Sequence, residues 1–214
     1  MAGMLTRLRA RWKLVLGLGI VGVFAAMFLA IGGAYGLAAT STEQFCIGCH
    51  EMRDNPYKEY TGTIHDSNRF GVRAICTNCH VPHEPIPLIV RKMEATFEVI
   101  GHLRGIIDTK EKYEAHRSVM ATRVWTQMLK NDSRECRNCH NFEKMKFAEQ
   151  TEKAQARHAK AKAEGWTCIE CHFAIAHDEP DGDGPVELRE KLKIARVPGP
   201  AAAAAPAPAP KASN

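Results

Sequence analysis

The residues with the clearest chemistry in this 214-residue sequence are eight cysteines, all of which fall in four C-x-x-C-H motifs. The motifs are Cys46–His50, Cys76–His80, Cys136–His140 and Cys168–His172, and their second cysteines are Cys49, Cys79, Cys139 and Cys171. In such a motif the two thiols add to the vinyl groups of a haem, and the histidine takes one axial face of the iron. A redox pair or half a zinc site would not need that histidine. The sequence therefore predicts four covalently bound haem c groups and no disulfide framework.

The second axial ligand of each iron must come from elsewhere in the chain. An iron with two protein ligands transfers electrons, whereas an iron with an open position can bind a small molecule. Six histidines lie outside the motifs: His65, His83, His102, His116, His158 and His177. His65, His158 and His177 lie beside motifs and are the favoured ligands, while the other three remain open. This supply of histidines favours electron transfer.

The spacing of the motifs indicates two similar halves. Motifs one and two begin 30 residues apart (46 to 76), and motifs three and four begin 32 residues apart (136 to 168). In each half the order is motif, histidine, motif, histidine. We therefore expect two haem pairs related by a rough pseudo-symmetry.

Met52 needs separate consideration because it lies two residues after His50, in the run C-I-G-C-H-E-M. Two residues cannot reach across a porphyrin ring, so Met52 can compete only for the face that His50 would take. If its thioether binds the iron, it displaces His50 and raises the reduction potential relative to two histidines. The alternative is a methionine that packs on the ring edge.

Residues 14–39 carry no charged side chain and predict a transmembrane helix. At about 1.5 Å per residue this run spans about 39 Å, more than the hydrocarbon core of about 30 Å. A cleaved signal peptide would have a shorter apolar core of about 7–15 residues. The basic segment 1–13 favours a cytoplasmic N-terminus, with the remainder in the periplasm. Small residues at four-residue steps between Gly22 and Ala38 would allow a homodimer through this helix.

The rest of the chain predicts a mainly α fold, a small haem-packed periplasmic domain over residues 42–180. Apolar residues from Met93 to Ile107 recur at three- and four-residue steps, which indicates a helix packed on haem edges. Residues 143–164 are rich in helix formers and are followed by Gly165, a typical helix end. The segment 181–214 is expected to be a disordered Ala/Pro-rich tail. Outside residues 1–13 the chain is nearly neutral, which argues against a nucleic-acid partner.

Three segments around the motifs resemble the NapC/NirT family of tetrahaem quinol dehydrogenases, which have one N-terminal membrane helix. They are Thr63–Pro82, Asn131–His140 and Thr167–His177, and the likeness covers roughly residues 10–180. The resemblance implies a single-pass protein of the cell inner membrane that oxidises menaquinol or ubiquinol. Its electrons would pass through the four haems to a periplasmic reductase complex, foremost the periplasmic nitrate reductase.

The resemblance also implies roles for individual ligands. Met52 would ligate the first haem, His177 the second and His65 the fourth. For the third haem a short branch of the family uses a lysine that aligns with Lys92. This chain has a longer segment between motifs three and four, so we expect His158 to ligate the third haem instead.

The quinol site implied by the resemblance lies beside the first haem. Lys92 is one candidate there, and the acid that the family places at this site is Glu98 or Asp108. An acid–base group is chemically sensible because quinol oxidation needs a proton acceptor within hydrogen-bond reach.

Two other classes of function remain open at the level of sequence. A terminal multihaem reductase of a small oxyanion would need an open haem facing water and nearby cations, and the spare histidines argue against it. A cytochrome that passes electrons only between proteins would not touch quinol.

Overall fold

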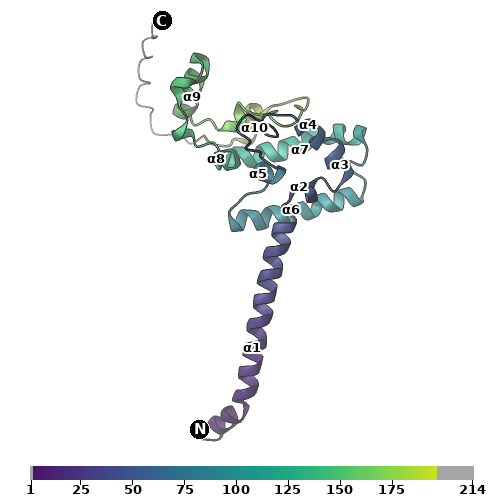
Figure 1. The fold of residues 1–214 in the computed structure, drawn as a ribbon, viewed down its shortest axis with the longest axis vertical. Coiled ribbons are helices and arrows are strands. Elements are labelled where there is room, and N and C mark those ends of the chain that lie inside the picture. Colours follow the sequence, from purple (N-terminus) through teal and green to yellow (C-terminus); the bar gives the residue numbers. More distant parts are fainter. Residues whose placement is uncertain (1, 197–214) are drawn as a thin grey trace. The chain divides into compact units, whose positions relative to one another are not determined.

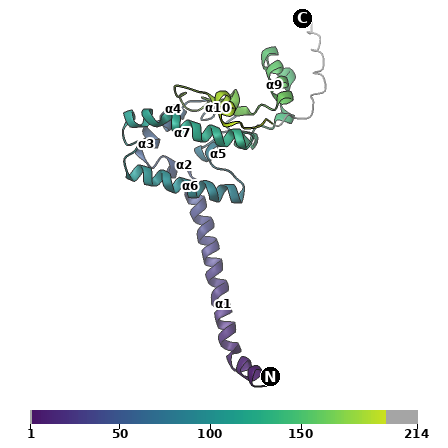
Figure 2. The same cartoon turned by 180° about the vertical axis from the view of Figure 1, so that it is seen from behind.

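The computed structural model describes residues 2–196, with side chains from residue 11 onward. Over this range the chain is helical and contains no strand, which confirms the mainly α prediction (Figures 1 and 2). The chain divides into two compact units after Cys46.

The first unit consists of α1 (Ala2–Ala39) and the short α2 (Glu43–Cys46). Residues 11–39 of α1 are long and apolar enough to cross a membrane, and none of them is buried. The hydroxyls of Thr40 and Ser41 donate to the carbonyls of Gly36 and Leu37 at 2.8 and 2.7 Å. These bonds satisfy carbonyl groups that the end of a helix leaves without partners.

The second unit is built on two long helices, α6 (Pro85–Leu103) and α7 (Lys110–Lys130). They run along opposite sides of a group of short helices that includes α3 and α5 (Figures 1 and 2). The other elements are α3 (His50–Asp54), α4 (Pro56–Tyr60), α5 (Cys76–His80), α8 (Arg134–Arg137), η1 (Phe142–Lys144), η2 (Phe147–Glu149), α9 (Glu152–Glu164), η3 (Cys168–Glu170) and α10 (Pro185–Leu192).

Local sequence signals explain where several helices begin and end. A proline occupies the first turn of α6, where its missing N–H costs nothing. The Thr151 hydroxyl caps α9 by accepting the N–H of Ala154 at 3.3 Å. Gly165 ends α9 with a φ of 71°, the left-handed conformation that glycine adopts without strain.

The apolar core of the second unit is small. It joins α7, η3 and α10 through Trp125, Met128, Leu129, Ile169 and Leu188. Beside it lies a buried ion pair in which Arg189 Nε is 3.0 Å from Glu170 Oε1. Such a core leaves much of the second unit to be held together by something other than apolar packing.

The structure corrects the predicted boundary of the tail. Residues 185–192 of the segment expected to be disordered form α10, which packs on α7 through Leu188. The helix has only eight residues, half of them charged, so its apolar positions gave no clear periodicity in the sequence. The remainder of the predicted tail, 197–214, lies outside the described residues.

We predict that Leu188→Ala lowers the free energy of unfolding by about 2–4 kcal/mol, because the truncation leaves a cavity in a small core. Leu192 lies in the same helix but is 47% exposed, so Leu192→Ala is the matched control and should cost far less. Guanidinium unfolding followed by far-ultraviolet circular dichroism measures both. Equal effects would contradict the placement of α10 in the core.

Candidate functional site

Motifs two, three and four each form a helical turn at α5, α8 and η3, whereas motif one spans the end of α2 and the start of α3. In motifs three and four the histidine N–H donates to the carbonyl of the first cysteine, from His140 to Cys136 and from His172 to Cys168, both at 2.8 Å. Residues i, i+3 and i+4 share one helix face, so this turn directs both thiols and the imidazole of a motif to the same side. The local fold thus arranges the three groups that a covalent haem needs.

Each motif histidine lies opposite a second histidine in the second unit. The ring centres are 6.2 Å apart in His50–His102 and His65–His140, and 6.1 Å apart in His80–His177 and His158–His172. Metal–imidazole bonds are about 2.0 Å long and a ring centre lies about 1.1 Å behind its nitrogen, so two rings on one metal are about 6.2 Å apart. The four spacings therefore fit one iron between each pair of rings.

Two of these pairs differ from the pairing that the resemblance implied. His177 lies opposite the second motif, as expected. His65, however, lies opposite His140 of the third motif, and His158 lies opposite His172 of the fourth. The expected third and fourth partners are therefore exchanged, since residue spacing does not determine which motif a segment folds against.

The position of His158 is set by the segment that precedes it. The ring of His158 lies 5.8 and 5.9 Å from those of Phe142 and Phe147. Its Nδ1 is 2.8 Å from the side-chain oxygen of Gln150. Because that oxygen can only accept, Nδ1 carries the proton and Nε2 remains for a metal.

Sequence reasoning left His102 open, but the structure places it opposite His50. Its Nδ1 is 2.6 Å from Oε1 of Glu51, a residue that is only 2% exposed. Burial disfavours the ionised form of Glu51 and so acts to raise its pKa. Hydrogen bonds from the backbone N–H of Glu51 and from His102 outweigh this effect, so the pKa of Glu51 lies below the ordinary value. A carboxylate only accepts hydrogen bonds, so Nδ1 of His102 carries the proton and Nε2 remains for a metal.

Met52 is not brought into the His50–His102 pair. It follows His50 by two residues within α3, and such residues point to roughly opposite sides of a helix, about 200° apart. Its side chain is 40% exposed. The role of Met52 as an iron ligand stays a prediction.

The candidate quinol-site acids each have a basic partner. Glu98 pairs with Arg91 at 2.9 Å, and Asp108 pairs with Lys112 at 2.6 Å. The hydrogen bond from Lys112 lowers the pKa of Asp108, and the charge on His50 acts in the same direction. This interaction with His50 favours Asp108 over Glu98. The third candidate, Lys92, lies in α6, where its carbonyl accepts the hydroxyl of Thr96.

The thiols of motifs two, three and four converge. A hydrogen bond to Cys168, together with burial, raises the pKa of Cys136. Burial raises the pKa of Cys79, and the nearby Cys139 adds to the effect. Groups attached to these motifs would therefore meet close to one another.

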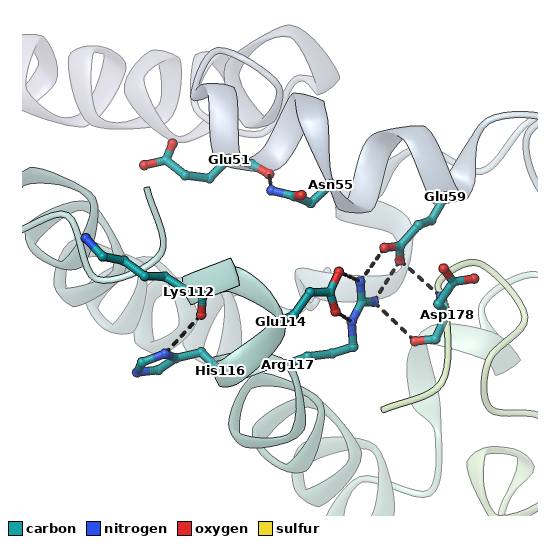
Figure 3. Close-up of polar contacts among 8 residues, drawn as sticks. All are labelled: Glu51, Asn55, Glu59, Lys112, Glu114, His116, Arg117 and Asp178. Carbon is teal, nitrogen blue, oxygen red and sulfur yellow. Dashed lines mark hydrogen bonds and ion pairs between the residues drawn. The ribbon is translucent and has the colours of Figure 1, made fainter. Parts of the chain in front are cut away.

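A charged network holds the segment that carries His177 (Figure 3). Arg117 of α7 donates to Glu59 of α4 at 2.9 Å and to the carbonyl of Asp178 at 3.3 Å. The N–H of Asp178 donates to Glu59 at 3.0 Å, and Arg117 also bonds Glu114. Burial acts to raise the pKa of Glu59, but Arg117 and the Asp178 N–H outweigh it and the pKa is lowered.

Comparisons with known proteins identify relatives that are c-type cytochromes, as the four motifs and the paired histidines suggest. Residues 8–182 match the model of the NapC/NirT cytochrome c family, N-terminal region. The chain is 46% identical over 184 residues to the cytochrome c-type protein NapC of Escherichia coli (strain K12), covering 84% of this chain and 92% of the relative. It is 49% identical over 166 residues to the denitrification system component NirT of Stutzerimonas stutzeri, covering 78% and 83%.

A third relative, from Allochromatium vinosum, bears the name of a candidate tetraheme cytochrome-c type protein. The chain is 44% identical to it over 162 residues, which cover 76% of this chain and 84% of the relative. No solved structure matches the chain.

We predict that the ionised Glu59 side chain stabilises the protein at pH values above 4.5, the ordinary pKa of a glutamate. This stabilisation should be lost as the pH falls through the lower pKa that Glu59 has in the folded protein. The difference in unfolding free energy between wild type and Glu59→Gln should be large at pH 7 and shrink below pH 4.5. Guanidinium unfolding at a series of pH values measures it. Glu114→Gln is the control, since Glu114 contacts the same arginine from a more exposed position. A difference that is constant with pH would contradict the ion pair.

Proposed function

The chain belongs to the NapC/NirT cytochrome c family, and on that basis we propose that it oxidises membrane quinol and passes the electrons through four haems to a periplasmic reductase. The observation that carries this proposal is the set of four histidine pairs, each spaced for one iron. Irons with two imidazole ligands transfer electrons and leave no position for a small substrate. The pairs therefore argue against a terminal reductase.

The donor groups fit four haem c groups. Each motif offers two thiols for covalent attachment and one imidazole, and a second imidazole stands opposite. Each haem, when bound, would supply a one-electron centre. The proposed second ligands are His102 for motif one, His177 for motif two, His65 for motif three and His158 for motif four. Met52 is the alternative ligand at the first motif.

The closeness of the thiols of motifs two, three and four supports a proposed order of electron transfer. Cys79 interacts with Cys139, and Cys136 interacts with both Cys168 and Cys79. Haem edges attached there would be near neighbours, which suits transfer from one to the next. This arrangement supports motifs two, three and four as a relay.

Quinol oxidation releases two protons as well as two electrons, so the chain must offer a proton acceptor near the point of electron entry. We assign this role to Asp108, because it interacts with His50 and because its carboxylate is ionised and able to accept a proton. Glu98 and Lys92 are the further candidates. The quinol is menaquinol or ubiquinol.

The proposed setting is the inner membrane of the cell. Residues 11–39 supply the span, and the basic N-terminal segment favours a cytoplasmic end with the haem unit in the periplasm. We propose periplasmic nitrate reductase as the partner, which agrees with a relative named as part of a denitrification system. The comparisons give no support to a homodimer through the small-residue stripe, and we do not propose one.

We predict that quinol reduces the haems of the protein in lipid vesicles and that Asp108→Asn slows this reduction by about 100-fold, the usual contribution of a positioned base. Stopped-flow spectra of the haem bands measure the rate. Glu98→Gln is the matched control and should have a much smaller effect. If quinol reduces no haem in the wild-type protein, the proposed function fails.

We also predict that His102→Ala converts one of the four haems from low spin to high spin, because its iron loses one of two imidazoles. Met52→Ala should leave all four haems unchanged. Low-temperature electron paramagnetic resonance of the oxidised protein distinguishes the two spin states. The reverse result, a change with Met52→Ala alone, would assign the first iron to the thioether.

A further inference from the structure

Helix α6 presents a continuous apolar stripe to solvent. None of its residues is buried, and Ile86 and Phe97 are 76% and 75% exposed. At about 100° per residue the stripe covers about 100° of the helix surface, as in an amphipathic helix. It consists of Ile86, Ile89, Val90, Met93, Phe97 and Ile100.

The side of α6 that faces the histidine pairs is a different one. Arg91 donates to the carbonyl of His80 at 3.3 Å, and His102 bonds Glu51 at 2.6 Å. On an ideal helix these two residues lie about 150–170° from the middle of the stripe. The stripe therefore lies on the side of α6 away from the contacts with His80 and Glu51, so we expect it to pack on something other than the haem of the first motif.

The composition of the stripe favours lipid over a protein partner. The stripe runs for about 21 Å, from residue 86 to residue 100 at about 1.5 Å per residue, without one polar side chain. Protein interfaces carry about one hydrogen bond per 100–200 Å², whereas interfacial helices place a purely apolar face among acyl chains. Soluble surfaces rarely leave so large an apolar patch uncovered.

The length of the connection to α1 keeps the second unit within reach of a bilayer. Helix α1 ends at Ala39 and the second unit begins at Ile47, eight residues later. Even fully extended, this segment reaches only about 28 Å. The second unit therefore begins within about 28 Å of the end of α1.

We propose that α6 lies in the membrane–water interface, with its apolar stripe among the lipid acyl chains and its His102 side toward the haem unit. The inference rests on the membrane anchor of the proposed function and not on quinol chemistry. It gives the second unit a defined side toward the bilayer. The first motif, whose histidine faces His102, would then be close to the depth at which a lipid-soluble quinol resides.

Photo-cross-linking of the full-length holoprotein in phosphatidylethanolamine–phosphatidylglycerol vesicles tests this. Phe97 is replaced by p-benzoylphenylalanine, which inserts into nearby C–H bonds on illumination. Val119 of α7, 48% exposed but outside the stripe, is the matched control, and Phe28 of α1 is the control for the anchor. Visible spectra of the haems show that each variant is folded.

We expect lipid adducts, detected by peptide mass, at positions 97 and 28 and none at 119. Adducts at 28 without any at 97 would overturn the inference while leaving the anchor intact. A cross-linked dimer through position 97 would overturn it in favour of a second copy of the chain. If position 28 also gives no adduct, α1 does not lie in the membrane, and the inference fails together with the membrane anchor.

Discussion

The second unit is organised around one recurring interaction, a pair of imidazole rings whose centres lie about 6 Å apart. Four such pairs recur with ring separations of 6.1–6.2 Å. Three of them join segments that are 50 or more residues apart in sequence, such as His80 and His177. Apolar packing contributes less, since the core cluster contains five buried residues. Bonds from these histidines to iron would therefore supply much of the stability that a hydrophobic core gives other domains of this size.

The pairs also interlock the two halves of the second unit. His65 comes from the first half and faces His140 of the second, while His177 comes from the second half and faces His80 of the first. The repeat visible in the sequence is thus not a pair of separate dihaem modules. Each half completes a site in the other, and the Glu59–Arg117–Asp178 network strengthens the exchange at His177 (Figure 3).

Features that depend on local sequence could be predicted, and features that depend on tertiary contacts could not. The motifs, the apolar span, and α9 between Thr151 and Gly165 all have short-range signals. The partner of each motif has none, because residue spacing does not determine which loop folds against which haem face. One sequence feature could have pointed to His102: it lies on the side of α6 opposite the apolar stripe. Helix α10 has only eight residues, too few to show a period, and its contact with α7 explains it.

The exchange of ligands between halves has a consequence for biosynthesis. His50 can meet His102 early, but His80 must wait until residue 177 has been made, 97 residues later. At about 5–20 residues per second this delay lasts roughly 5–20 s. Until then His80 has no partner imidazole across from it. A chain that stops short of residue 177 cannot form the His80–His177 pair, so this pair depends on synthesis of the C-terminal segment.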